Sequence, residues 1–319
     1  MNVRGPSAVG ISCIIPTLGR GRVLFDTIEM LLAQSQPAHE IVVVDQTATP
    51  DEATRLALEV WHENGAIRWL RQVEPNASKA RNAGALAATG DVVLFLDDDI
   101  RVKPDFLAAY AETFARTGAL AVSGQVLEGD AQSVDELPPK AFDPEIGWLY
   151  FRMNYAKECE TSFMMSGNVA IRRNIFLQLG GMDENYERGA YREESDFTQR
   201  FKQAGHAFVF QPQASIYHLG AVGAPQGGSR SWIKNKRIAG FHHCVGDWYF
   251  NLRFVRGRLV VPLFAASFRH FVVNRYNIGH PWLLPLLGVR WLCALPLAVW
   301  RRLRGPKLVR CSAHAGSLC

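Results

Sequence analysis

The first 220 residues alternate between short runs rich in β-branched residues and longer stretches in which apolar residues recur at helical spacing. Such alternation is typical of a sheet whose strands are mostly parallel, because a helix must return the chain to the edge where the next strand begins. We therefore predict an α/β fold, a mostly parallel sheet with helices on both faces. The strands are expected at residues 11–17, 40–46, 66–73, 92–99 and 207–218, and the helices at 23–35, 51–62, 76–88, 191–205 and from 104 onward.

The most unusual of these strands ends in three consecutive carboxylates. Residues 92–100 read VVLFLDDDI, five apolar residues followed at once by Asp97, Asp98 and Asp99. Neighbouring like charges disfavour one another's ionised forms, so a positive partner is expected there. Carboxylate oxygens suit Mg²⁺ or Mn²⁺, and such cations usually complete their shell with water and the phosphates of a substrate. The triplet therefore predicts a divalent-cation site that takes a phosphorylated ligand.

Polar residues end the other predicted strands as well. Pro16 and Thr17 end the first strand, Asp45 ends the second, and His218 ends the closing one. In parallel sheets ligands bind beyond the carboxyl ends of the strands, so these residues are expected to meet the aspartates at one edge. An imidazole from His218 would favour Mn²⁺ over Mg²⁺, although a lone histidine is more often structural. Both interpretations of His218 stay open.

A second acidic group, Glu193, Glu194 and Asp196, opens the predicted helix at 191–205. Acidic residues in a first turn complement the helix dipole and need no further function. This group, however, lies between a Gly-Gly turn at 180–181 and the closing strand, where it could face the same crevice. A carboxylate in that place could act as a general base on an acceptor hydroxyl.

Taken in order, these motifs resemble the family 2 glycosyltransferases with the GT-A fold. The resemblance covers about residues 11–220 and depends on several ordered motifs, which is stronger than any single one. The similar segments are CIIPT at 13–17 with Arg20, IVVVD at 41–45, Asn76 with ARNAG at 80–84, LFLDDD at 94–99, GGMDE at 180–184, EESDF at 193–197 with Arg200, and IYH at 216–218.

The resemblance implies an inverting glycosyltransferase that moves a sugar from a nucleoside-diphosphate sugar to a hydroxyl of a saccharide or lipid-linked acceptor, in bacterial-type polysaccharide or glycolipid assembly. Asp99 and His218 would hold Mn²⁺ or Mg²⁺. Glu194 would be the general base, with Glu193 as the alternative, because the family usually has the shorter aspartate at this place. The residues implied in nucleotide-sugar binding are Pro16, Thr17, Arg20, Asp45, Arg81, Asn82, Asp97 and Asp98.

Charge divides the chain into two parts. Residues 221–319 hold 15 lysines and arginines against a single acid, Asp247, a net charge of +14, whereas residues 1–220 hold 20 basic and 29 acidic residues, a net charge of −9. We therefore predict a GT-A catalytic domain at 1–220 and a basic, largely helical extension at 221–319. At the start of the extension, GGSR at 227–230 is expected to form a glycine turn that closes over the diphosphate or serves as a linker.

The extension contains an apolar stretch, residues 281–300, with Arg290 as its one charge and prolines at 281, 285 and 296. Its 20 residues are enough to cross a bilayer, but a central arginine costs about 2.5–3.5 kcal/mol on insertion scales. Lying in the interface is the better interpretation, and a pair of helices packed on the catalytic domain is an alternative of nearly equal weight. We expect contact with an anionic membrane surface through residues 230–310, on the cytoplasmic face.

Other observations exclude or demote further classes. The first residues lack an apolar signal segment and the six cysteines form no close CxxC pair, so a cytoplasmic protein with reduced thiols is expected. No nucleic-acid motif is present, and no nucleic-acid partner is expected. A metal-dependent phosphatase is a weak alternative, because its motif needs threonine or valine where Arg101 stands. A membrane-associated nucleotide-sugar-binding protein without activity is the other alternative.

Overall fold

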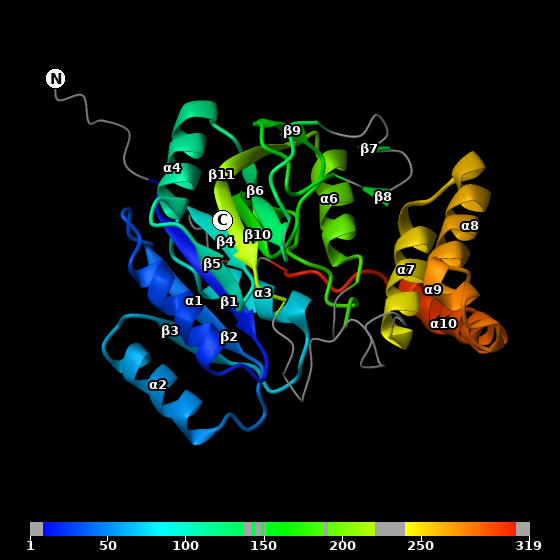
Figure 1. Ribbon diagram of the computed structural model, residues 1–319, viewed down its shortest axis with the longest axis horizontal. Helices are drawn as coiled ribbons and strands as arrows, with labels where there is room; N and C mark the ends of the chain where they lie inside the picture. The colour runs from blue at the N-terminus through cyan, green and yellow to red at the C-terminus, as the bar shows by residue number, and fades with distance from the viewer. Residues whose placement is uncertain are drawn as a thin grey trace.

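The computed structural model describes residues 9–129, 131–136, 142–143, 148–149, 151–187, 191–220 and 240–310. Within these ranges the chain forms a central sheet flanked by helices, with a further group of helices beyond one end of it (Figure 1). The glycine turn predicted at 227–230 lies outside the described residues. So does part of residues 128–165, whose first half is rich in Asp, Glu and Pro and is expected from the sequence to be a polar loop.

Nine of the described strands form the central sheet, in the order β3-β2-β1-β4-β10-β6-β11-β5, with β9 paired to β11. Strands β3, β2, β1 and β4 are parallel, β10 runs antiparallel between β4 and β6, and β11 is parallel to β6. The strands are β1 (Ile11–Thr17), β2 (Glu40–Asp45), β3 (Arg68–Arg71), β4 (Val92–Leu96), β5 (Ile100–Val102), β6 (Ala121–Glu128), β9 (Cys159–Thr161), β10 (Asn168–Arg172) and β11 (Phe208–His218); β7 (Phe142–Asp143) and β8 (Trp148–Leu149) form a separate pair.

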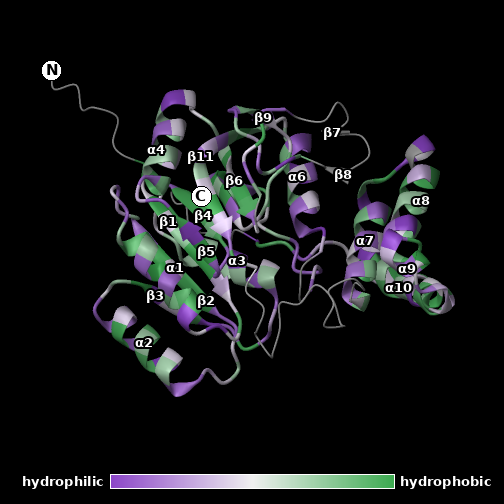
Figure 2. Cartoon of the chain, viewed as in Figure 1, coloured by the Kyte–Doolittle hydropathy of each residue, from purple (hydrophilic) through white to green (hydrophobic). Residues whose placement is uncertain are grey.

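Helices cover both faces of this sheet, as predicted. Alternate residues of each strand point to opposite faces, so in β1 Cys13 and Ile15 pack with α1, α2 and α4, whereas Ile14 packs with α3, α5 and α6. Burial on both faces explains why the central strands β1, β2 and β4 are largely apolar, as Figure 2 shows. The helices are α1 (Arg22–Leu32), α2 (Glu52–Glu63), α3 (Ala77–Ala87), α4 (Phe106–Thr117), α5 (Arg173–Gln178) and α6 (Glu193–Gln203).

The C-terminal part is helical and has a core of its own. Trp248, Tyr249, Phe250 and Trp291 are buried together there, and Tyr186 from the sheet-containing part joins them. Its elements are α7 (Phe241–Phe254), η1 (Gly257–Leu259), α8 (Val260–Phe271), α9 (Arg275–Ile278), η2 (Pro281–Leu283) and α10 (Leu284–Arg304). The predicted α/β fold with a largely helical extension is therefore confirmed.

After α10 the chain returns to the sheet-containing part. The backbone N–H of Val309 donates to the carbonyl of Gly180 (2.8 Å), and the N–H of Glu184 donates to the carbonyl of Lys307 (3.0 Å). The return segment thus binds along the GGMDE turn. The domain boundary at residue 220 stays a prediction.

Several element bounds differ from the sequence expectations. Strand β4 ends at Leu96, so Asp97–Asp99 form a turn that leads into the short strand β5. The strand expected at 66–73 is shorter, Arg68–Arg71, and the helix expected at 23–35 ends at Leu32.

Candidate active site

One end of the site combines the aspartate triplet with His218. Nε2 of His218 lies 3.2 Å from Oδ1 of Asp99 and 3.8 Å from Oδ2 of Asp97, while Nδ1 lies 3.2 Å from Oε1 of Glu128. Strand register causes this meeting, because His218 is paired with Ile100 in β5 and with Glu128 in β6. The sequence prediction that the end of the closing strand meets the triplet agrees with this geometry.

The His218 imidazole is held between carboxylates. Its hydrogen bonds to Asp99 and then to Glu128 raise the pKa of His218 to about 10, against the opposing effect of burial. The carboxylates of Asp97 and Asp99 together with Nε2 of His218 form a set of donor atoms that suits Mn²⁺ or Mg²⁺. Across the described ranges no group of three or more acidic, histidine or cysteine side chains is arranged to hold a metal ion by itself.

Asp98 faces the protein rather than the crevice. It accepts a hydrogen bond from Oγ1 of Thr17 (2.7 Å) and pairs with Nε of Arg20 (3.2 Å), whose Nη2 also lies 3.3 Å from Asp99. Burial, partly offset by Arg20, raises the pKa of Asp98 to about 6. Asp98 therefore fastens the end of β1 to the triplet, and its predicted contact with the nucleotide stays a prediction.

The end of β2 carries Asp45 in a buried position. Its Oδ2 pairs with Nη1 of Arg71 (2.5 Å), and its Oδ1 accepts from the N–H of Thr47 (2.8 Å). Pro16 lies opposite Val44 in the neighbouring strand, beside this pair. The structure thus brings together, at one edge of the sheet, Pro16, Thr17 and Asp45, which the resemblance implies in nucleotide-sugar binding.

The other end of the site carries the two glutamates that begin α6, in different environments. Glu193 is buried and pairs with Nη1 of Arg81 (3.3 Å), and Nη2 of Arg81 lies 3.8 Å from Oδ1 of Asp97. Glu194 is half-buried, and its Oε1 accepts hydrogen bonds from the N–H (2.7 Å) and Oγ (2.8 Å) of Ser166. Arg81 therefore links the glutamate end to the aspartate end, while Glu194 is the more accessible carboxylate.

Asn82 supports a turn rather than facing the crevice. Its Nδ2 donates to the carbonyl of Met182 (2.9 Å) and its Oδ1 accepts from the N–H of Met182 (2.8 Å). Gly181 has φ 65°, and a Cβ there would lie 2.4 Å from Oδ1 of Asn82, so the turn needs glycine. Asn82 thus holds the GGMDE turn against α3, and its predicted role in nucleotide-sugar binding stays a prediction.

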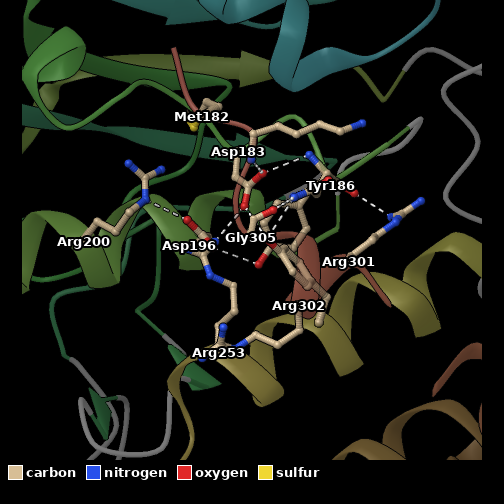
Figure 3. A network of polar contacts seen from close by, with 12 residues as sticks. Met182, Asp183, Tyr186, Asp196, Arg200, Arg253, Arg301, Arg302 and Gly305 are labelled. Atoms are coloured by element: carbon tan, nitrogen blue, oxygen red, sulfur yellow. Dashed lines mark hydrogen bonds and ion pairs between the residues drawn. The ribbon is translucent and has the colours of Figure 1, made fainter. Parts of the chain in front are cut away.

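A buried polar network fastens α6 to the C-terminal helices (Figure 3). Asp196, fully buried, pairs with Nε of Arg200 (2.8 Å) and with Arg253 of α7, which also reaches Oδ2 of Asp183 at 2.7 Å. Burial, opposed by the two arginines, keeps the pKa of Asp196 above its ordinary value. Asp196 is therefore a structural member of the second acidic group.

The residue before the two glutamates is also held by α7. Arg192 has φ 78°, a left-handed conformation uncommon for a residue with a side chain, and its Nε lies 2.8 Å from Oδ1 of the buried Asp247. Its guanidinium also lies 4.9 Å from the ring centre of Phe250. Helix α7 thus fixes the backbone from which Glu193 and Glu194 project.

Residues 12–180, more than half of the chain, match the family described as glycosyl transferase family 2. The chain belongs to this family. The resemblance read from the motifs is thereby confirmed, and family membership does not favour the phosphatase alternative.

Relatives of the chain are distant from it in sequence, and two solved structures are similar to it in fold. The glucosyl-dolichyl phosphate glucuronosyltransferase of Haloferax volcanii is 26% identical over 203 residues, which cover 60% of this chain and 63% of that protein. The chain is also similar to the structure of S. aureus TarS in complex with UDP-GlcNAc (TM-score 0.63, 16% identity, 91% of this chain and 80% of that one). A second similar structure is the mannosyltransferase PcManGT from Pyrobaculum calidifontis with GDP-Man and Mn²⁺ (TM-score 0.53, 21% identity, 93% of this chain and 79% of that one).

Sequence reasoning about this family member missed several residues that support the site. Arg71, Glu128 and Ser166 each bind a predicted site residue across 26 to 90 positions of sequence. Gly167 leaves room for Asp97, because a Cβ there would lie 2.2 Å from its Oδ2. The segment SGN at 166–168 was visible as a break between apolar runs, which is the only signal that could have pointed to it.

Proposed function

We propose that the protein is an inverting glycosyltransferase that moves a sugar from a nucleoside-diphosphate sugar to an acceptor hydroxyl. The observation that carries the proposal is the position of Arg81, 3.8 Å from Asp97 and 3.3 Å from Glu193, between the two acidic groups. The aspartate triplet with His218 has the ligands for a cation that carries a diphosphate. The two glutamates could take a proton from a hydroxyl, and the positive charge of Arg81 between the groups suits a phosphate leaving group.

At the aspartate end, Asp99 and His218 would hold Mn²⁺ or Mg²⁺. When bound, such a cation neutralises the charge that develops on the leaving diphosphate. Arg20, 3.3 Å from Asp99, adds positive charge at the same end. Asp45, fixed by Arg71, would bind the nucleobase beside Thr17.

At the other end we assign the general base to Glu194. Glu193 is buried and paired with Arg81, so its negative charge is already balanced within the protein. Ser166 holds Oε1 of Glu194 with two hydrogen bonds, and we assign Oε2 to take the proton of the acceptor hydroxyl as that oxygen attacks the anomeric carbon. Attack from the side opposite the diphosphate inverts the configuration at that carbon.

We further infer a lipid-linked acceptor, used at the cytoplasmic face of a membrane in polysaccharide or glycolipid assembly. The relative from Haloferax volcanii supports this, because its name describes transfer to glucosyl-dolichyl phosphate, a sugar on a lipid carrier. The loop at 128–165 and the region after residue 220 are the segments that we expect to select the acceptor.

The base assignment is tested by Glu194→Gln. We expect this variant to lose transfer by a factor of about 10² or more, because the amide cannot accept the proton, while nucleotide-sugar binding persists. Binding is measured as Mn²⁺-dependent thermal stabilisation across a panel of nucleotide-sugars, and a selective shift also identifies the donor. Transfer at the wild-type rate by Glu194→Gln would contradict the assignment.

Glu193→Gln is the matched comparison. If Glu194 is the base, the Glu193→Gln variant should keep transfer activity. The substitution leaves the buried Arg81 with a weaker partner, so the assay is run at a temperature and protein concentration at which the variant is folded. The reverse pattern would assign the base to Glu193. A wild-type protein that binds nucleotide-sugars but transfers and hydrolyses none of them would support the alternative of a binding protein without activity.

A further inference from the structure

Helix α10 is apolar on two opposite faces. One face is buried against the other C-terminal helices, through Leu287, Trp291, Ala294 and Ala298. Nε1 of Trp248 donates to the carbonyl of Trp291 (2.8 Å), and Nε1 of Trp291 donates to Oγ of Ser267 in α8 (3.0 Å). This face is a completed protein core.

The opposite face is exposed and equally apolar. Exposed residues recur every three or four positions along it, at Leu286, Val289, Cys293, Pro296, Trp300 and Leu303, and we refer to these six as the apolar stripe. At about 1.5 Å per residue the stripe extends over roughly 25 Å. An amphipathic helix of a soluble protein normally carries polar residues on the face away from its core. A continuous apolar stripe in that place indicates a surface that meets a partner.

Helix α10 is held against the rest of the protein at its C-terminal end. Arg301 is buried, donates to the carbonyl of Asn185 (2.5 Å) and pairs with Glu187 (2.9 Å), and the N–H of Lys307 then donates to Oδ1 of Asp183 (2.9 Å). Residues 281–304 are long and apolar enough to span a membrane, with 22% of the most apolar window buried inside the protein. Crossing a bilayer would require α10 to leave both its core and these polar partners, so a position flat on the surface is favoured.

The charges of the C-terminal helices determine which partner fits. The single acid of residues 221–319, Asp247, is fully buried and paired with Arg192. Exposed arginines stand on the same helical region, at Arg258, Arg269, Arg275, Arg302 and Arg304. The Arg304 guanidinium lies 4.1 Å from the ring centre of Trp300, at the end of the stripe. Apolar side chains next to arginine and tryptophan are the composition of a helix that lies in an anionic lipid interface.

We propose that α10 lies flat in the surface of an anionic bilayer, with the apolar stripe in the acyl boundary and the exposed arginines of the same helix, Arg302 and Arg304, at the headgroups. The membrane contact is inferred from α10 alone. The further conclusion that this contact places the active site beside a lipid-linked acceptor rests on the proposed function. The partner is a lipid surface, because the stripe carries no charge that a nucleic acid or an acidic peptide would need along its length.

The test is sedimentation of the full-length protein with two kinds of vesicle, phosphatidylcholine alone and phosphatidylcholine with about one third phosphatidylglycerol. The full chain is needed because residues 305–310 bind the turn at 180–184. The test variant is Val289→Glu with Leu303→Glu. Its control is Val60→Glu with Val73→Glu, which adds the same two charges at equally exposed positions of the other part: 58% for both Val289 and Val60, and 81% for both Leu303 and Val73.

We expect the wild type and the control to bind anionic vesicles, with weaker binding to neutral ones and in high salt, and the test variant to bind at least about tenfold more weakly. Equal binding by test variant and control would overturn the proposal. So would a wild type that ignores vesicles but forms a dimer in sedimentation equilibrium that the test variant abolishes, because the stripe would then cover a second copy. Thermal unfolding checks that the test variant is folded.

Donor binding on the same preparations separates this proposal from the proposed function. The test variant changes surface residues of α10 and should keep the Mn²⁺-dependent stabilisation by nucleotide-sugar. Vesicle binding without donor binding in the wild type would contradict the proposed function and leave the membrane contact supported. Donor binding without vesicle binding would contradict the membrane contact alone.

Discussion

The sheet-containing part and the C-terminal helices differ in which side chains they bury and which they expose. In the first, strands are covered on both faces, and charged residues lie inside at strand ends, where each meets a partner: Asp98 with Arg20, Asp45 with Arg71. In the second, helix α10 is covered on one face and exposes an apolar stripe on the other. The comparison teaches that the first part is organised to hold polar ligands within it, and the second to present apolar surface outside it.

The two parts meet through buried charges as well as through Tyr186, which packs in the core of the C-terminal helices. Arg253 and Asp247, both on α7, reach Asp183, Asp196 and Arg192 around the first turn of α6. Buried ion pairs of this kind stabilise little over apolar contacts but are costly to break singly. The junction is therefore specific, and its residues offer ways to test how far the parts depend on each other.

The largest effect is expected from Arg253→Met. Removing the guanidinium leaves Asp183 and Asp196, both fully buried, without their shared cation, and should lower the free energy of unfolding by about 3–5 kcal/mol. Denaturant unfolding measures the change. Arg269→Met, at an exposed position of α8, is the control and should change stability by less than about 0.5 kcal/mol. Similar losses in both variants would contradict a specific junction.

A smaller effect, on catalysis, is expected from Asp247→Asn. The weaker partner should loosen Arg192 and its left-handed backbone, and so shift Glu194, which follows two residues later. We expect kcat to fall by about tenfold, within the range for misplacement of a catalytic group, while the KM for the donor changes little. Asp105→Asn, at an exposed position before α4, serves as the control. An unchanged kcat in folded Asp247→Asn would show that α7 does not position the base.

Much of the sheet-containing part could be predicted from the sequence, because strand alternation and strand-end polarity are local patterns. The approach of His218 to Asp99 followed from the rule that ligand-binding residues gather at one sheet edge. The partners could not be predicted in the same way. Whether Asp45 meets Arg71, or Glu194 meets Ser166, depends on strand register and on turns between distant segments, which no local pattern encodes.

The C-terminal part was ambiguous in sequence for a physical reason. Residues 281–300 are apolar around the whole helix, so an interfacial helix and a packed helix had nearly equal weight. The structure has both features at once, since Trp291 and Ala294 are buried while Val289 and Trp300 are exposed. Side-chain periodicity cannot separate two apolar faces, because it detects only a difference between them.

The smallest effect compares cysteines of the two parts. Burial raises the pKa of Cys13, in β1, and of Cys244, in α7, to about 12, whereas Cys293 is exposed in the apolar stripe. At pH 8 the fraction of Cys13 and of Cys244 present as the reactive thiolate should be roughly a thousandfold smaller than for an ordinary thiol. A thiol reagent should therefore modify Cys293 first. The measurement uses a Cys311→Ser, Cys319→Ser background and mass spectrometry of the labelled peptides.

Anionic vesicles should slow the labelling of Cys293 and leave the labelling rate of the half-buried Cys159 unchanged, because only the stripe enters the lipid surface. Labelling of Cys293 at the same rate with and without vesicles would contradict the prediction that the stripe, unlike the sheet-containing part, enters the lipid surface.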